Sequence, residues 1–425
     1  MAFSVQEASG RILAAIHPLG TETIRLRDAL GRVLANDARS PIEHPPWDNS
    51  SMDGYAVHAA DAANASKSSP VVLPVAETVR AGQRPSAPLR AGTAVRVMTG
   101  APVPDGTDTV IRVEDTDRGT EFVTIHDHRD LRKNIRLRGV ELHKNDIAVY
   151  SGTVIGPAQI GVLASVGAAK VRVHKVPSVA VIASGDELVD LDKFSEVEAG
   201  HAIVSSNSYT IRAAAAATGA TIADYGIVRD DPRALANRIH AARTSDLIVT
   251  TGGVSVGAFD HTRDVVRGLG GDVRIDRVRM RPGAPLAFGL IQGVPWLGLP
   301  GNPVSALVTF ELFARPLIRR LRGEHAIFPL PVPVIVDESI ELQAPLTHFL
   351  RCVVRPGDDG ELHARLTGSQ SSAILTSMTI ATGLLIVPHD RMRVGVGARL
   401  YAFLSGDAGR STTFRLSLEG EPGTE

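Results

Sequence analysis

The segment Thr250–Asp260 carries the residue types in this chain that are best suited to bind a charged ligand. It reads Thr-Thr-Gly-Gly-Val-Ser-Val-Gly-Ala-Phe-Asp. The apolar run Leu247–Val249 before it predicts a buried strand, and His261–Arg267 after it predicts a helix. A glycine-rich turn between a strand and a helix presents backbone N–H groups and the helix dipole to an anion. Asp260, at the predicted N-cap, would cap the helix or hold a cation beside that anion; a plain βα turn is the alternative.

Three more loops with polar residues follow predicted strands. They are Ser184-Gly185-Asp186-Glu187, Arg229-Asp230-Asp231-Pro232 and Leu299-Pro300-Gly301-Asn302-Pro303. Ligands bind outside the carboxyl ends of parallel strands, so we expect Glu187, Asp230 and Asp260 to lie near the amides of Gly252 and Gly253. Carboxylates repel a phosphate unless a cation lies between them. Mg²⁺, held by one or two carboxylates and by phosphate oxygens, is the expected ion.

Helix capping is the alternative role for these polar residues. Asp231 before Pro232 is predicted to be a cap, and so are Asn207 and Ser208 at the start of a helix over 207–217. Glu187 and Asp230 occupy no obvious cap position. Two prolines, Pro300 and Pro303, predict a rigid wall before a helix whose first N–H groups face the site, which suits a flat ring or a phosphate.

Composition narrows the class of protein. The 425 residues are 44% hydrophobic and 21% charged with a net charge of −1, which gives no reason to expect nucleic acid or a membrane as partner. Cys352 is the single cysteine, which excludes an intrachain disulfide and a cysteine zinc cluster. No signal-like start and no apolar run of transmembrane length is present, so we expect a cytoplasmic location.

The hydrophobic pattern changes three times along the chain. Residues 4–17 and 24–37 predict amphipathic helices, and short β-like runs broken by Pro and Gly extend from 41 to about 150. Strands and helices alternate from 177 to 326, which predicts an α/β domain with a doubly wound, mostly parallel sheet. A β-rich tail follows the proline run at 329–333, with 412–418 as its last candidate strand.

Several motifs along most of the chain resemble the molybdopterin molybdenumtransferase family, the bacterial MoeA type, which is similar to the E domain of gephyrin. They are Asp48–Val57, Met98–Pro104, Ser184–Leu188, Gly252–Gly257, Leu299–Ser305 and, in the tail, Gly368–Ser372.

The resemblance implies a four-part subunit and a homodimer. The parts are an α/β molybdopterin-binding domain (1–25 and 177–326), a dimerisation and linking domain (26–46 and 144–176), a β-rich domain (47–143) and a barrel-like C-terminal β domain (327–425). It also implies an active site between the α/β domain of one subunit and the β-rich domain of the other. Molybdopterin adenylyltransferase and apo-molybdoenzymes are the implied protein partners.

The implied reaction combines adenylylated molybdopterin with molybdate, assisted by Mg²⁺, to give the molybdenum cofactor and AMP. By motif, Glu187, Asp230 and Asp260 serve the metal and pyrophosphate, and Asp53 and Thr99 are catalytic residues of the β-rich domain. The remaining candidates bind substrate: Gly252, Gly253, Ser255, Gly257, Arg136, Arg138, Arg281, Pro300, Asn302, Pro303 and Ser305. A solvated basic stretch is the alternative for Arg136 and Arg138.

Three segments depart from the family pattern. Arg138-Gly139-Val140-Glu141 replaces Arg-Gly-Glu-Asp, Arg281-Pro282-Gly283-Ala284-Pro285 replaces Lys-Pro-Gly-Lys-Pro, and Ala258-Phe259 replaces Glu-Ala. Arginine and lysine are not interchangeable, and Ala284 carries no charge, so weaker oxyanion affinity is a hypothesis. A diverged paralogue is therefore an alternative, either a scaffold with weakened catalysis or a tungstate-preferring transferase. An adenylylating enzyme is a third alternative, against which the β-rich modules and the Pro300–Pro303 motif argue.

Overall fold

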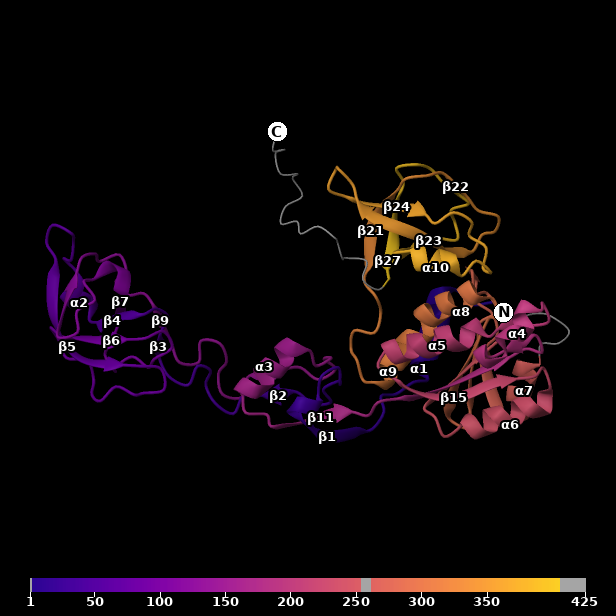
Figure 1. The fold of residues 1–425 in the computed structure, drawn as a ribbon, viewed down its shortest axis with the longest axis horizontal. Coiled ribbons are helices and arrows are strands. Elements are labelled where there is room, and N and C mark those ends of the chain that lie inside the picture. Colours follow the sequence, from indigo (N-terminus) through magenta and orange to yellow (C-terminus); the bar gives the residue numbers. More distant parts are fainter. Residues whose placement is uncertain (1, 254–260, 406–425) are drawn as a thin grey trace. The chain divides into compact units, whose positions relative to one another are not determined.

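The computed structural model describes residues 2–253 and 261–405 (Figure 1). The chain forms two compact units, each built from more than one segment. The first comprises Met1–Glu22, Gly31–Ala35 and Val173–Glu425, and the second comprises Thr23–Leu30 and Asn36–Arg172. The chain passes between them within β1 (Thr21–Arg25), again before Gly31 and after Ala35, and finally within β11 (Lys170–His174). The division into four parts stays a prediction.

A six-stranded sheet is the centre of the first unit. Its order is β15 (Thr221–Val228), β12 (Ser178–Ser184), β16 (Leu247–Thr251), β20 (Val294–Leu299), β19 (Ala287–Ile291) and β17 (Gly271–Ile275). The first four strands are parallel, whereas β19 and β17 are added antiparallel. The predicted α/β class with a mostly parallel sheet is confirmed.

Helices cover both faces of this sheet because its strands are apolar on both sides. Val179 and Val181 of β12 face one core with α1 (Val5–Ala14), α5 (Ser206–Ala217), α8 (Pro303–Thr309) and α9 (Arg315–Leu321). Ala180 and Ile182 face the other core with α6 (Pro232–Ala242) and α7 (Thr262–Gly268). A π-helical turn, η4 (Phe310–Ala314), joins α8 to α9, so residues 303–321 form one long helix with a local bulge.

The C-terminal part of the first unit is a closed β-barrel. Its strands are β21 (Pro331–Val336), β23 (Thr347–Pro356), β24 (Leu362–Leu366), β25 (Gly383–Val387) and β27 (Arg399–Leu404). Hydrogen bonding runs β23–β24–β21–β27–β25 and returns to β23, and β18 (Met280–Arg281) pairs with β23. The predicted strand 412–418 lies outside the described residues.

The second unit is built on a five-stranded sheet. The order is β7 (Thr109–Arg112), β4 (Gly54–Val57), β6 (Ala94–Val97), β5 (Val71–Val79) and β8 (Phe122–Ile125). The short strands β3 (Asn49–Ser50) and β9 (Ile135–Arg136) form a separate antiparallel pair. Likewise, β2 (Ala38–Arg39) pairs with β10 (Ile147–Val149), and α3 (Pro157–Ser165) follows.

Short elements complete the described residues. In the first unit they are β13 (Leu188–Val189), η3 (Leu191–Lys193), α4 (Phe194–Glu198), β14 (Ile203–Val204), β22 (Ile340–Glu341), α10 (Thr376–Ile380) and β26 (Arg393–Val394). In the second unit they are η1 (Leu26–Asp28), α2 (Ala59–Ala62) and η2 (Val113–Asp115). Within residues 2–253 and 261–405, none of the helices has the length and apolarity needed to span a bilayer.

The helix predicted over 24–37 is wrong. The segment contains the end of β1, one 3₁₀ turn and then Gly31, whose φ of +75° no α-helix contains. Val33 and Leu34 are buried, but Leu30 is 63% exposed, so the apolar spacing does not define one helical face. The segment also crosses from one unit to the other and back.

Candidate active site

The four predicted loops line one pocket at the carboxyl ends of β12, β15, β16 and β20. Its volume is about 720 Å³. The predicted site residues that line it are Glu187, Asp230, Gly252, Gly253, Pro300, Asn302, Pro303 and Ser305. The predicted residues Ser255, Gly257 and Asp260, and the departures Ala258 and Phe259, lie outside the described residues.

Two glycines after β16 bring bare backbone to the pocket. Gly252 has a φ of +88° and Gly253 a φ of +61°. A Cβ on Gly252 would lie 2.5 Å from the Ser184 carbonyl oxygen, and one on Gly253 would lie 2.3 Å from Oγ1 of Thr262. Only glycine combines this backbone conformation with such close packing. The helix α7 then starts at Thr262 with His261 as its N-cap, so the prediction of the N-cap at residue 260 is wrong by one position.

Carboxylates enter the pocket from two loops. Ser184 Oγ donates a hydrogen bond of 3.2 Å to Oδ1 of Asp230, and Asp230 N donates one of the same length to Oδ1 of Asp186. Glu187 folds back over Gly185, where a Cβ would lie 2.8 Å from its Oε2. Asp231 accepts a 2.6 Å hydrogen bond from Ala234 N and caps α6, as predicted.

The carboxylates of Glu187 and Asp230 can hold a cation only if oxygen atoms of a bound ligand complete its coordination. Among residues 2–253 and 261–405, no three Asp, Glu, His or Cys side chains gather in a way that would hold a metal. Mg²⁺ commonly uses one or two carboxylates together with substrate phosphate oxygens and water. Glu187 and Asp230, both lining the pocket, match that mode of binding.

The start of α8 forms another wall of the pocket. Asn302 is its N-cap residue and Pro303 its first residue, and the Asn302 side chain makes no capping bond. Val304 N donates to the Ser372 carbonyl of the barrel part at 3.1 Å, so one of the predicted free N–H groups is already used. Asn207 was predicted to be a cap, but its Nδ2 donates to the Gly301 carbonyl at 2.7 Å and holds this wall.

The start of α5 also shows that the capping predictions for Asn207 and Ser208 are wrong. The N-cap of α5 is Ser205, and both Asn207 and Ser208 lie inside the helix. Ser208 Oγ shares a 2.7 Å hydrogen bond with Ser205 Oγ. The predicted caps were therefore placed two to three residues too late.

Arg281 lines a separate pocket of about 380 Å³ on the barrel side. Arg351 also lines it and is fully buried. The Arg351 guanidinium donates to the carbonyls of Ser369, Gln370 and Ser371 and to Ser377 Oγ. None of these partners is a carboxylate, and burial lowers the pKa of Arg351. A buried cation held only by neutral groups leaves positive potential in this pocket.

Two other residues shape the region around Arg281. His348 lines the same pocket and is 3% exposed, and its burial lowers its pKa. Gly283 has a φ of +103°, and a Cβ there would lie 2.4 Å from Cγ2 of Thr309 in α8. The Ala284 carbonyl accepts a 2.9 Å hydrogen bond from Val278 N. The Arg281–Pro285 loop is thus packed against α8.

The predicted residues of the β-rich domain all belong to the second unit. Thr99 donates to Oδ1 of Asp53 from both its backbone N and its Oγ1, each at 2.7 Å. These two bonds lower the pKa of Asp53. Arg136 lies in β9 opposite Asn49 of β3, and Arg138 N donates to Oδ1 of Asp48 at 2.6 Å. Val140 is 67% exposed.

The fold and the main pocket define an α/β protein with a glycine-lined pocket at the carboxyl ends of a parallel sheet, where proteins of this class bind their ligands. Comparison with known protein families narrows the class of protein further. Residues 180–320 match the family described as a probable molybdopterin binding domain. Residues 3–167 match the MoeA N-terminal region (domains I and II), and residues 333–401 match the MoeA C-terminal region (domain IV).

Relatives cover nearly the whole chain. Molybdopterin molybdenumtransferase 2 of Mycobacterium tuberculosis is 36% identical over 93% of this chain and 98% of its own length. The molybdopterin molybdenumtransferase of a Nostoc species is 38% identical over 89% and 87%. The crystal structure of a molybdopterin biosynthesis MoeA protein from Pyrococcus horikoshii superposes with a TM-score of 0.82 at 25% identity, covering 95% of this chain and 100% of that one.

The chain therefore belongs to the MoeA family of molybdopterin molybdenumtransferases, which confirms the predicted family and enzyme class. Arg351 and Asn207 are the pocket residues whose roles sequence reasoning missed. Arg351 sits in an apolar strand, where a charged residue gives no sign of its burial. Asn207 looks like an ordinary helix cap until Gly301 is seen beside it.

Proposed function

We propose that this protein joins molybdate to adenylylated molybdopterin and releases AMP with the help of Mg²⁺. The observation that carries the proposal is the main pocket, where glycine backbone, two carboxylates and the proline wall come together. In the proposed reaction, a water oxygen bonds to phosphorus, the P–O–P bond breaks, and AMP leaves. The two thiol protons of molybdopterin leave with one oxo group of molybdate as water, and both sulfurs bind molybdenum.

We propose a separate role in this reaction for each group of residues in the main pocket. Gly253 is proposed to offer its backbone N–H to the pyrophosphate, whereas Gly252, which also lines the pocket, already donates its N–H to the Leu299 carbonyl at 3.2 Å. Pro300 and Pro303 form a rigid wall suited to the flat pterin. Glu187, Asp230 and Asp260 are proposed to hold Mg²⁺, which when bound neutralises the pyrophosphate charge and favours attack on phosphorus. Ser184, through its bond to Asp230, orients one of these carboxylates.

The pocket of Arg281 and Arg351 is proposed to receive the oxyanion. The Arg281 guanidinium offers charge and donors to a tetrahedral dianion, and the buried Arg351 adds positive potential, although its N–H groups and those of Gln370 are engaged within the protein. Arg281 replaces one lysine of the family pattern, and Ala284 replaces the other. We propose that the loss of that second charge weakens oxyanion binding, which leaves the choice between molybdate and tungstate to experiment.

A homodimer is also proposed, supported by the surface of α3. Its sequence, Pro-Ala-Gln-Ile-Gly-Val-Leu-Ala-Ser, is apolar on most sides, yet Leu163 is its one buried residue within the described chain. A helix that is apolar all round is normally buried. We propose that a second copy of the chain packs against the exposed apolar surface of α3. Substrate roles for Asp53, Thr99, Arg136 and Arg138 rest on the family motifs.

One experiment tests the proposed reaction against the scaffold alternative that Ala284 favours. Purified protein is incubated with adenylylated molybdopterin, Mg²⁺ and either molybdate or tungstate. AMP release and reconstitution of an apo-molybdoenzyme are measured together. The proposal predicts both with at least one oxyanion. Tight binding of adenylylated molybdopterin without AMP release with either oxyanion would establish the scaffold instead.

A further inference from the structure

The turn that carries Asp53 is held from two sides. On one side, Val113 N, just after β7, donates to the Asp53 carbonyl at 3.0 Å, and Arg112 of β7 lies opposite Gly54 of β4. On the other side, Ser51 N donates to the Asn134 carbonyl at 2.9 Å. Asn134 has a φ of +67°, and it leads directly into β9, which pairs with β3.

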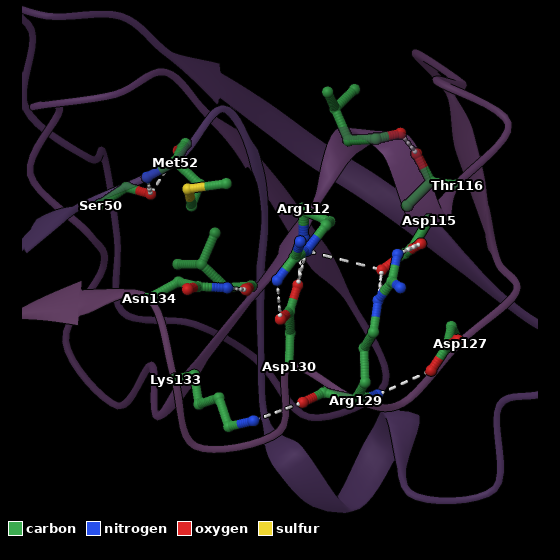
Figure 2. Close-up of polar contacts among 12 residues, drawn as sticks. Ser50, Met52, Arg112, Asp115, Thr116, Asp127, Arg129, Asp130, Lys133 and Asn134 are labelled. Atoms are coloured by element: carbon green, nitrogen blue, oxygen red, sulfur yellow. Dashed lines mark hydrogen bonds and ion pairs between the residues drawn. The ribbon is translucent and has the colours of Figure 1, made fainter. Parts of the chain in front are cut away.

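The two sides are joined by one ion pair, Arg112–Asp130, whose carboxylate is buried. Asp130 is 1% exposed and accepts three hydrogen bonds from Arg112: from Nε at 2.7 Å, from Nη2 at 2.8 Å and from the backbone N at 3.2 Å. Figure 2 shows Arg112 between Asp130 and Asp115, with Arg129 on the other side of Asp115. The mutual bonds hold the pKa of Asp130 below its usual value.

The loop from Asp130 to Asn134 is pinned to β7 at further points. Val110 N donates to the Lys133 carbonyl at 3.2 Å, and Asn134 Nδ2 donates to the Val110 carbonyl at 2.9 Å. A shift of this loop would therefore move both Ser51, through Asn134, and Arg136, which follows two residues later. The ion pair fixes the distance between the two supports of the Asp53 turn.

We propose that Asp130 is a positioning residue for Asp53, acting through Arg112 and the Asp130–Asn134 loop. Asp130 itself touches no proposed substrate group. Its part is to hold the Ser50–Asp53 turn where Asp53 meets Thr99. The catalytic meaning of that position rests on the proposed function, whereas the structural coupling does not.

The test compares Asp130→Asn with a matched control, Asp117→Asn. Asp117 also has a lowered pKa and accepts three hydrogen bonds, from Gly119 N, Thr124 N and Thr124 Oγ1, but it makes none to the Asp53 turn. The pKa of Asp53 is followed by carbon NMR of its carboxylate in the full chain. In Asp130→Asn it is expected to rise toward the ordinary 3.8, and in Asp117→Asn it is expected to stay at the parent value. An unchanged Asp53 pKa in Asp130→Asn overturns the inference.

Kinetics separate positioning from loss of structure. We expect kcat for AMP release to fall about 10- to 100-fold in Asp130→Asn, with the Kd for adenylylated molybdopterin within about twofold. In an Asp53→Ala background, Asp130→Asn should have little further effect, because its route is through Asp53. An undiminished effect there overturns the inference. If the parent protein releases no AMP, the proposed function fails while the NMR comparison still decides the coupling.

A second variant covers the case in which Asp130→Asn does not fold. Arg112→Lys keeps the positive charge but cannot form the bidentate hydrogen bonds to the Asp130 carboxylate. The same rise of the Asp53 pKa, smaller in size, is expected. A folded Arg112→Lys protein with parental Asp53 pKa and kcat contradicts the inference.

Discussion

Thr99 donates two hydrogen bonds to a single carboxylate oxygen of Asp53, one from its amide and one from its hydroxyl. Both bonds favour the ionised carboxylate and lower its pKa. A lowered pKa in the folded state adds stability above the unfolded value, about 3.9. That contribution is lost as the pH falls through the folded-state value. The pair is thus a stable, ionised acceptor at neutral pH.

The first prediction concerns this pair. Thr99→Val removes the hydroxyl donor and keeps the amide, so the Asp53 pKa should rise part of the way toward 3.8. AMP release should fall by about tenfold if the oriented carboxylate contributes to the reaction. NMR titration and steady-state kinetics measure the two effects. Thr99→Ser, which keeps the hydroxyl, is the control and should remain near the parent in both.

The second prediction separates two adjacent carboxylates. Asp230→Asn should raise the Mg²⁺ concentration needed for half-maximal AMP release at least about tenfold, because a charged metal ligand is lost. Asp231→Asn is the control, because asparagine caps a helix as well as aspartate does. Magnesium titrations after removal of metal with EDTA supply the measurement. Equal magnesium requirements in the two variants would refute the assignment of Asp230.

A third prediction concerns glycine conformation. Gly252→Ala should lower the free energy of unfolding by about 1–3 kcal/mol, because φ at this residue is positive and the new Cβ would clash with the Ser184 carbonyl oxygen. Gly10→Ala is the opposite case, since Gly10 is exposed within α1 and a Cβ there has nothing within 4 Å. It should stabilise by about 0.5–1 kcal/mol. Urea unfolding of the parent and of both variants measures these changes in the free energy of unfolding.

The fourth prediction concerns the buried guanidinium. Arg351→Met leaves three carbonyls and the Ser377 hydroxyl without their donors, so the free energy of unfolding should fall by about 3 kcal/mol or more. Arg365→Ala, at an exposed position of β24, should change it by no more than about 0.5 kcal/mol. Similar small effects in both would mean that the Arg351 network adds little stability.

A fifth prediction restores the missing charge. Ala284→Lys should lower the KM for molybdate about tenfold if a second cation strengthens oxyanion binding. Ala284→Gln, of similar length without the charge, is the control. Measurements at low and high salt separate the electrostatic part, which salt should reduce. A KM unchanged by the lysine would remove Ala284 as the cause of any weak affinity.

Local patterns predicted the α/β sheet and the main pocket because parallel strands place their following loops at one edge. The helix Pro232–Ala242 begins where the predicted cap Asp231 and the following proline place its start, because these two residues give a strong start signal. The roles of Glu187, Asp230 and the other site residues stay predictions, but the pocket that brings half of them together lies where the order of strands and loops predicted it.

What the sequence could not predict depends on contacts between distant segments. Leu26, Leu30, Val33 and Leu34 have helical spacing, yet the chain leaves and re-enters a unit there. Arg351 is buried because three carbonyls of the Ser369–Ser371 segment surround it, and no local signal marks that. Asn207 holds Gly301 across the pocket edge. Each case is decided by partners far along the chain.

The divided first unit has a consequence for synthesis on the ribosome. Helix α1 packs its Ala8 and Ile12 in the same core as Phe313 and Leu317, which lie about 300 residues later in the chain. It therefore emerges early and must wait for residues up to Leu321, while the second unit, complete at Arg172, has already been made. Domains fold as units during synthesis, at about 5–20 residues per second. The apolar face of α1 therefore lacks these core partners until the chain has been made as far as Leu321.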